Sequence, residues 1–253
     1  MSEAKALNVQ FSLFPSAPGG PKADEIFSCV FGSDADETQS NKSVSPQRNF
    51  LSQAKSQSKG AVQSVRVLPG RVDIQISPEE RVDGPDAFST VDAAESLESL
   101  LSGIGNFPWD DSEYLRLAVV CNVVEREEDL SAANLKVANL SGLQAVCAES
   151  LDLMVQMNRR KRIAGDVEVN RVTQYSCLQI QTGQYHVVDG QLRPASVVEF
   201  FASSVNFDFN TVPGDFVFSS ENVLPILSKI VELIRGAIKD LRLSSVLEFE
   251  EVK

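Results

Sequence analysis

The sequence predicts an α+β fold: a mostly antiparallel sheet of meanders and hairpins, packed against several helices that include a long C-terminal amphipathic helix. Residues 7–14 (LNVQFSLF) alternate apolar and polar side chains, as a strand with one solvated face does. Residues 61–77 contain two further alternating runs joined by Pro69–Gly70, which suits a type II turn. Residues 222–241 repeat apolar side chains at helical spacing, with charged ones opposite.

After the first strand, the chain turns and enters a short helix. The stretch 15–21 (PSAPGGP) is rich in turn residues and leaves Pro21 near the helix start, where proline is tolerated. Gly32 is a suitable stop after Phe31, because glycine readily adopts the left-handed conformation that ends helices. The polar composition of 33–47 predicts an exposed loop.

A second helix follows the hairpin, with Ser89 or Thr90 as its cap. The polar linker 105–113 (GNFPWDDSE) comes next and is the natural boundary between an N-terminal α+β half, 1–105, and a C-terminal half, 106–253. The sequence is also compatible with one continuous domain. Each half reads as strand, helix, antiparallel strands and helix, without a residue-level repeat.

The second half begins with 114–124 (YLRLAVVCNVV), whose continuous apolar character predicts a central strand. Residues 125–140 are expected to be helical. The alternating stretches 149–157 and 167–181 then predict a hairpin, and NRRKRIAGD (158–166) is interpreted as its turn.

Two glycine-containing turns divide the remaining strands. Thr182–Gly183 and Asp189–Gly190 predict successive hairpins, the second because Asp-Gly suits a type I′ turn. Residues 199–210 (EFFASSVNFDFN) alternate as a further strand. Asn222 caps the C-terminal helix, which places Pro225 in its first turn.

The chain of 253 residues is acidic, with 35 Asp and Glu against 23 Lys and Arg and a net charge of −12. Such a charge favours solubility and repels nucleic acid and anionic lipid at long range. The first residues lack the pattern of a signal peptide, and no apolar run approaches the roughly 18 residues of a membrane span. We therefore expect a soluble cytoplasmic protein without membrane contact.

Chemical motifs are sparse. The cysteines, Cys29, Cys121, Cys147 and Cys177, lie far apart in apolar stretches and form no CxxC pair, which favours buried free thiols over a zinc site. The single histidine, His186, excludes a His-rich metal site. Neither a GxxxxGK[ST] nor a GxGxxG motif occurs, so the sequence predicts no cofactor and no metal.

Four consecutive cations, Arg159, Arg160, Lys161 and Arg162, stand out in this acidic chain. Such a cluster binds phosphates or an acidic protein when its members converge on one ligand. A turn between strands also exposes long charged side chains to water without any function. The sequence favours the solvated turn and keeps these four residues as the candidate macromolecule-binding site.

A second candidate site is catalytic. If Thr182–Gly183 is a turn, Cys177 and His186 are diagonal neighbours on adjacent strands, about 7–8 Å apart between backbones. A thiol beside an imidazole can act as nucleophile and base. No orienting Asn or Asp and no oxyanion-binding glycine motif accompanies the pair, so a packed thiol is the favoured interpretation.

The sequence therefore favours a non-enzymatic protein that acts through macromolecular interactions, as a subunit or adaptor of a larger assembly, with a protein partner or self-association. The first alternative is a nucleic-acid-associated protein that uses 159–162. The second is an enzyme with a Cys177–His186 site. The apolar C-terminal helix and the segment SSVLEFEEV (244–252) either complete the monomer core or contribute to a homodimer.

Overall fold

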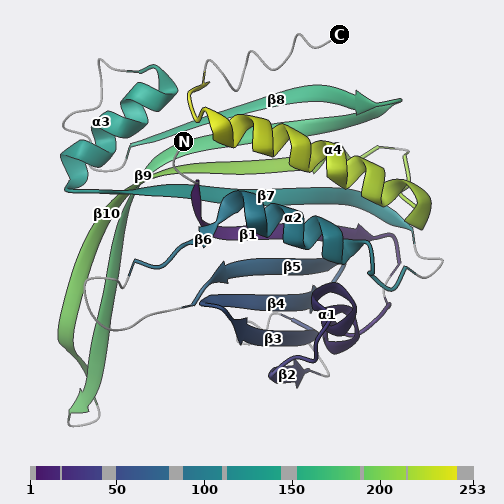
Figure 1. The fold of residues 1–253 in the computed structure, drawn as a ribbon, viewed down its shortest axis with the longest axis horizontal. Helices are drawn as coiled ribbons and strands as arrows, with labels where there is room; N and C mark the ends of the chain where they lie inside the picture. Colours follow the sequence, from purple (N-terminus) through teal and green to yellow (C-terminus); the bar gives the residue numbers. More distant parts are fainter. Residues whose placement is uncertain are drawn as a thin grey trace.

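The computed structural model describes residues 4–17, 19–41, 50–79, 88–109, 113–143, 153–188, 191–214 and 216–243, with the side chains of 182–197 outside this description. Within this part of the chain, ten strands form one sheet and four helices pack against it (Figure 1). Neighbouring strands are antiparallel throughout. The predicted α+β class with its mostly antiparallel sheet is therefore confirmed.

The elements follow one another along the chain as β1 (Lys5–Pro15), α1 (Ala23–Phe31), β2 (Glu37–Ser40), β3 (Ser52–Ser58), β4 (Ala61–Leu68), β5 (Arg71–Pro78), β6 (Val91–Asp92), α2 (Ala93–Ile104), β7 (Tyr114–Glu127), α3 (Leu130–Ser141), β8 (Met154–Ala164), β9 (Val167–Val188), β10 (Gln191–Thr211) and α4 (Ser220–Lys239). No helix in the described part of the chain combines the length and the apolar character that a membrane span requires.

The strands of residues 1–105 and of residues 106–253 belong to one sheet, and the elements of the two parts follow a similar order. The strand order is β2-β3-β4-β5-β1-β7-β10-β9-β8, and the short β6 pairs with the start of β1. β1 and β7, the first long strands of the two halves, lie side by side in the middle. In each half the chain continues through a helix and a meander whose last strand, β5 or β10, returns to pair with that first strand. A helix then ends each half.

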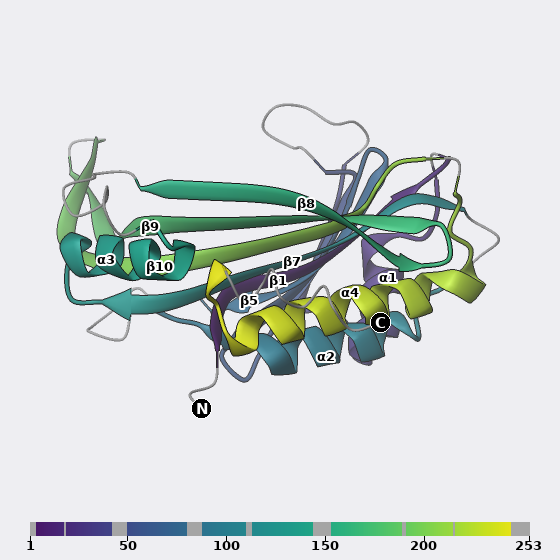
Figure 2. The ribbon, with the colours of Figure 1, turned by 90° about the horizontal axis from the view of Figure 1, so that it is seen from above.

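The four helices cover one face of the sheet. α2 and α4 contact each other over its middle, α1 covers β3 and β4, and α3 lies over β9 and β10 (Figures 1 and 2). The apolar members of the alternating strands point to this face. Phe11 stands between Ile74 and Val119, and Val119 in turn faces Phe209, all of them buried. This layer is the hydrophobic core.

The opposite face is polar, as expected when an antiparallel sheet exposes one side to solvent. One cross-strand row consists of Asn122, Asn206, Gln174 and Gln156 in register. No described helix packs on this side. The amide side chains can therefore satisfy their polar groups with each other and with water.

The predicted loop 33–47 contains a strand in its described part. β2 pairs with β3, and all of its residues are exposed. The sequence ETQS contains no apolar residue, so alternation could not reveal this strand. Its formation depends on the neighbouring β3, which belongs to a stretch that the sequence left unassigned.

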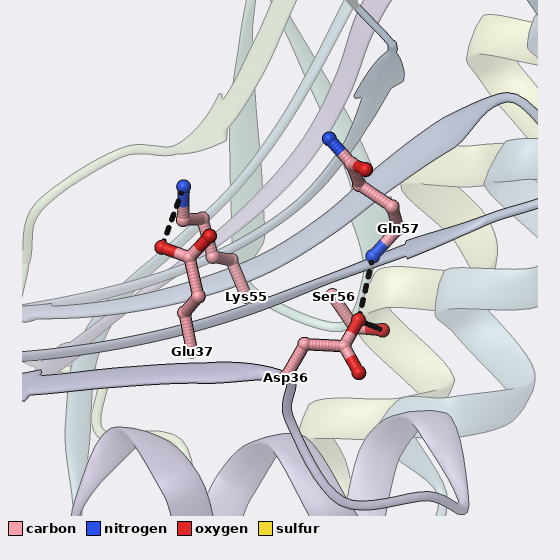
Figure 3. A network of polar contacts seen from close by, with 5 residues as sticks. All are labelled: Asp36, Glu37, Lys55, Ser56 and Gln57. Carbon is pink, nitrogen blue, oxygen red and sulfur yellow. Dashed lines mark hydrogen bonds and ion pairs between the residues drawn. The ribbon is translucent and has the colours of Figure 1, made fainter.

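Asp36 anchors β2 (Figure 3). Its carboxylate accepts hydrogen bonds from the Ser56 hydroxyl at 2.6 Å and from the Gln57 backbone N–H at 3.2 Å, beside the ion pair of Lys55 with Glu37 at 2.9 Å. The hydrogen bond of Ser56, and after it that of Gln57, lowers the pKa of Asp36 below its ordinary value of 3.8.

This shift predicts that β2 loosens in acid. Because the folded-state pKa of Asp36 is depressed, its contacts stabilise β2 fully above the unfolded-state pKa and are lost as the pH falls through the folded-state value. We expect the Asp36 carboxyl carbon to titrate below 3.8 in an NMR experiment, and Ser56→Ala to move that pKa upward. An Asp36 pKa that is the same in Ser56→Ala would contradict the assignment of the cause.

The start of α2 differs from the expected one. Its cap is Asp92, whose carboxylate accepts a hydrogen bond from the Glu95 N–H at 2.8 Å, rather than Ser89 or Thr90. Several residues before this helix can act as its cap. The spacing of the apolar residues does not distinguish between them, so the sequence located the helix start only to within about one turn.

The start of α4 also lies earlier than expected. Ser219 is the cap, and Asn222 is the third helical residue, whose side chain accepts from the Ser219 N–H at 3.0 Å. These two residues form a reciprocal capping box. Pro225 consequently lies beyond the first turn, inside the helix.

The last two strands are longer than expected. β9 passes through Thr182–Gly183 without a turn, and β10 begins at Gln191, before the strand predicted at 199–210. They pair from Gln191 opposite Val188 onward, and the predicted turn Asp189–Gly190 between them lies outside the described residues. The prediction of a turn at Thr182–Gly183 is wrong because glycine permits a turn without requiring one, and continuous pairing with β10 keeps the chain extended.

Candidate functional site

Cys177 and His186 are not brought together, because both lie in β9. His186 is nine residues further along this extended strand, which places their backbones about 30 Å apart. The alternative of a Cys177–His186 dyad depended on a turn at Thr182–Gly183, and β9 passes through these residues without one. The Cys177 thiol instead donates to Asn134 Oδ1 of α3 at 2.7 Å.

Cys29, Cys121 and Cys177 are free thiols, and Cys147 lies outside the described residues. Cys121 is buried as expected, and burial raises its pKa to about 12, so that it stays protonated at neutral pH. Cys29 and Cys177 are only half-buried. Among the described side chains, no three His, Cys, Asp or Glu gather closely enough to hold a metal ion.

The basic cluster 159–162 lies in a strand and not in the turn predicted for it. β8 contains all four cations, and the chain turns only at Gly165 and Asp166, with φ 51° at Gly165. β8 is the last strand in the order and therefore an edge of the sheet (Figure 1). The turn prediction relied on the solvation of charged side chains, but an edge strand is solvated as well and commonly carries charge.

Strand alternation places two of the cations on the helix-covered side. Arg159 stands opposite Arg171, and Lys161 stands opposite Val169. Arg171 and Val169 are both buried, and they belong to the same side of β9 as the core residue Tyr175. Arg159 and Lys161 therefore extend the covered face to its rim.

The other two cations alternate toward the polar face. Arg160 stands opposite Asn170, and its Nε donates to Asn170 Oδ1 at 3.2 Å. Arg162 is on the same side by alternation, directly before an irregularity in the β8–β9 register. An exposed ion pair of 3.9 Å joins it to Asp166. The four charges are thus divided between both faces of one edge.

The peptide groups of β8 alternate in the same way. The Cys177 N–H donates to the Leu153 carbonyl at 3.2 Å, which identifies the odd-numbered positions as those hydrogen-bonded to β9. The intervening residues of an antiparallel ladder direct both N–H and C=O away from their partner strand. In β8 these include Gln156, Asn158 and Arg160, whose peptide groups point to the outer edge.

A groove of about 800 Å³ lies along α4, and residues of β8 and of α2 also line it. Five basic and two acidic residues contribute to it, in an otherwise acidic protein. Its lining consists of Glu98, Leu101, Lys161, Arg162, Ile163, Ser228, Lys229, Val231, Glu232, Leu233, Arg235, Gly236 and Lys239. The sequence did not associate the cations of α4 with the basic cluster, because only the packing of α4 over the sheet brings them together.

Some of the charged residues that line the groove form ion pairs with each other. Lys229 Nζ lies 3.0 Å from Glu232, and Arg235 pairs with Glu98 of α2. About half or more of each of these side chains is exposed, so the pairs contribute little stability and can be replaced by other acidic groups. Apolar residues, among them Ile163, lie between the charges.

The arrangement can bind an acidic ligand, because basic residues outnumber acidic ones in the lining of the groove. It offers positive charge, apolar surface and a line of β8 peptide groups with which no further strand pairs in the described part of the chain. Comparison with protein-family models, with curated proteins and with solved structures finds no match to this chain.

Proposed function

We propose that this protein is a non-enzymatic binding protein, a subunit or adaptor of a larger assembly, whose edge strand β8 and adjoining groove receive an extended acidic segment of a protein partner. The division of the cations 159–162 between the two faces of an edge strand supports this proposal. A peptide added to β8 as a strand would place its side chains alternately on the same two faces. Acidic residues on either face of such a peptide would meet an Arg or Lys.

The backbone contributes a second part of the binding. The outward peptide groups of Gln156, Asn158 and Arg160 can form ladder hydrogen bonds with an incoming strand. These bonds give affinity without regard to sequence, whereas the charges select the partner. The groove beside α4 can accommodate apolar side chains of the same peptide.

Charged residues on an edge strand also prevent unwanted pairing between sheets. The positive charges of β8 disfavour apolar and basic strands, but they favour an acidic one. The same residues can therefore exclude most strands and select a few, as specific interfaces do.

Nucleic acid is the competing ligand. By strand alternation, a phosphate backbone lying on one face of β8 would meet two of the four cations. In the groove it would meet Lys161 and Arg162 together with the basic residues of α4, which are Lys229, Arg235 and Lys239. The net charge of −12 opposes its approach. The net charge opposes both anionic ligands, so it is the division of the cations between two faces that favours the acidic peptide.

The test measures binding of a labelled short peptide of alternating Glu and Val by fluorescence polarisation. The full chain is compared with Arg160→Glu/Arg162→Glu, and a Lys–Val peptide and a single-stranded oligonucleotide serve as alternative ligands. We expect the Glu–Val peptide to bind and the variant to lose about tenfold or more in affinity, because attraction becomes like-charge repulsion.

The matched control is Lys59→Glu/Arg66→Glu, which makes the same change of net charge at exposed positions of the N-terminal half. It should bind the peptide as the unmodified chain does. If both variants lost the same affinity for the peptide, the loss would be caused by the overall charge of the protein and not by the charges of β8. Binding of the oligonucleotide alone, with affinity that falls steeply as salt rises, would replace the proposal by the nucleic-acid function.

A further inference from the structure

We infer that Asn170, Asn210 and Asp208 hold the guanidinium of Arg160 in one orientation, and that Arg160 is thereby the residue that selects a carboxylate of the bound strand. This inference rests on the proposed function of β8 as a strand-binding edge. Arg160 touches the partner, and the other three are positioning residues behind it. They belong to β8, β9 and β10, which are neighbours at this edge of the sheet (Figure 1).

A chain of side-chain hydrogen bonds runs from Arg160 into the sheet. Arg160 Nε donates to Asn170 Oδ1, and Asn170 Nδ2 donates to Asn210 Oδ1, each at 3.2 Å. Asn210 Nδ2 in turn donates to Asp208 Oδ1 at 2.9 Å. Every bond points the same way, from the guanidinium at the edge to the carboxylate at the inner end, so each one polarises and strengthens the next.

The sheet fixes the positions of these residues. Asn170 stands directly opposite Arg160 on one side and directly opposite Asn210 on the other, so the three side chains form one cross-strand row on the polar face. Asn210 is only 3% exposed, and its amide finds its partners within the chain of hydrogen bonds. A buried amide that loses its partners destabilises the fold, so burial keeps the chain of hydrogen bonds in this arrangement.

The hydrogen bond at Nε leaves the other end of the Arg160 guanidinium for a ligand. In the described part of the chain, no acceptor pairs with its Nη groups and no carboxylate forms an ion pair with it. The two Nη groups present parallel N–H donors, which match the two oxygens of a carboxylate. An acidic side chain of an added strand would therefore meet a charge that its neutral partner Asn170 leaves uncompensated.

Arg162 lies on the same face without such support. It stands opposite Glu168 and pairs with Asp166 at 3.9 Å, through side chains that are 65% and 94% exposed. A partner would have to displace Asp166 and order a mobile side chain, whose conformational entropy is lost on binding. In Arg160 much of that entropy is already lost before the partner arrives. Arg160 is therefore the better carboxylate receptor of the two.

Side-chain hydrogen exchange tests the orientation without any partner, by NMR of the arginine Nε–H groups. We expect the Arg160 Nε–H to exchange about tenfold more slowly than that of Arg162, because it is hydrogen-bonded to Asn170. Asn170→Leu removes the acceptor and should raise the Arg160 rate to that of Arg162. The matched control is Gln174→Leu, which removes an amide from the same face of β9 and should leave both rates unchanged.

A double-mutant cycle with the Glu–Val peptide tests the selection. Asn170→Leu should weaken peptide binding about three- to tenfold, because Arg160 must then be ordered on binding. The same substitution should have no further effect in an Arg160→Gln background, and it should keep its full effect in an Arg162→Gln background. Asp208→Asn keeps the shape of the inner end but removes its charge, and should cause a smaller loss that also depends on Arg160.

The two experiments separate a failure of this inference from a failure of the proposed function. Equal Arg160 exchange rates in the unmodified chain and in Asn170→Leu would overturn the inference, and so would a loss of affinity that persists in the Arg160→Gln background. If Asn170→Leu speeds exchange but binds the peptide as tightly as the unmodified chain, Arg160 does not select the partner and the proposed function stands. If the peptide binds none of these proteins, the proposed function fails and the selective role of Arg160 fails with it.

Discussion

Phe207→Ala is expected to lower the free energy of unfolding by about 3–5 kcal/mol. Phe207 is completely buried in β10, opposite Cys121 of β7, and its ring meets that of Phe209 edge-on at 5.9 Å between centroids. Truncation removes the hydrophobic contribution of the ring and leaves a cavity between the sheet and the helices, which a close-packed core fills only in part. This loss is a large fraction of the roughly 5–15 kcal/mol that stabilises a typical domain.

Urea unfolding followed by circular dichroism measures this effect. The control is Phe216→Ala, because Phe216 is 41% exposed and loses less burial on truncation than the completely buried Phe207. We expect the control to lower the free energy of unfolding by clearly less than Phe207→Ala does. Similar losses at the two positions would show that the layer around Phe207 is not the principal core.

Gly103→Ala is expected to destabilise the protein by about 1–3 kcal/mol, although alanine is normally the better helix former. Gly103 lies in α2 where this helix crosses α1, and a Cβ atom there would stand 2.4 Å from the Val30 carbonyl oxygen and 2.7 Å from Val30 Cγ1. Both distances are far below van der Waals contact. The two helices would have to separate, which also disturbs Leu100 and the other core residues between them.

The neighbouring Ser102 provides the control, since it is exposed in the same helix. Ser102→Ala should leave stability unchanged or raise it by a few tenths of a kcal/mol through helix propensity. Thermal unfolding of both variants measures the difference in stability. A Gly103→Ala protein as stable as Ser102→Ala would mean that α1 and α2 pack less closely than described.

Local sequence patterns were sufficient to predict a strand or helix where one face of the element is buried and the other is solvated. The alternation of 7–14 predicted β1, and Pro69–Gly70 predicted the β4–β5 hairpin, in which Gly70 has φ 70°. Local sequence patterns did not predict the structure where a segment lacks a contrast between buried and exposed side chains. β2 has no buried residue, and the turn assigned to Thr182–Gly183 lies within β9.

The candidate site was visible in the sequence only in part. The cations 159–162 were recognised, but their assignment to a turn concealed their division between two faces of an edge strand. Lys229 and Arg235 appeared in the sequence only as the polar side of a helix. Their contribution to the groove depends on contacts between residues far apart in the chain, which no local pattern contains.

The sequence by itself determined the α+β class, most of the strands and helices, and the position of the unusual basic cluster, because these depend on periodicity and turn chemistry over a few residues. Only the tertiary structure decided that β1 and β7 join the two halves, that β8 is an edge, and that α4 completes a groove beside it. Strand order and helix placement arise from burial shared among distant segments. The surface that we propose for binding is therefore a property of the assembled sheet and not of any one stretch of sequence.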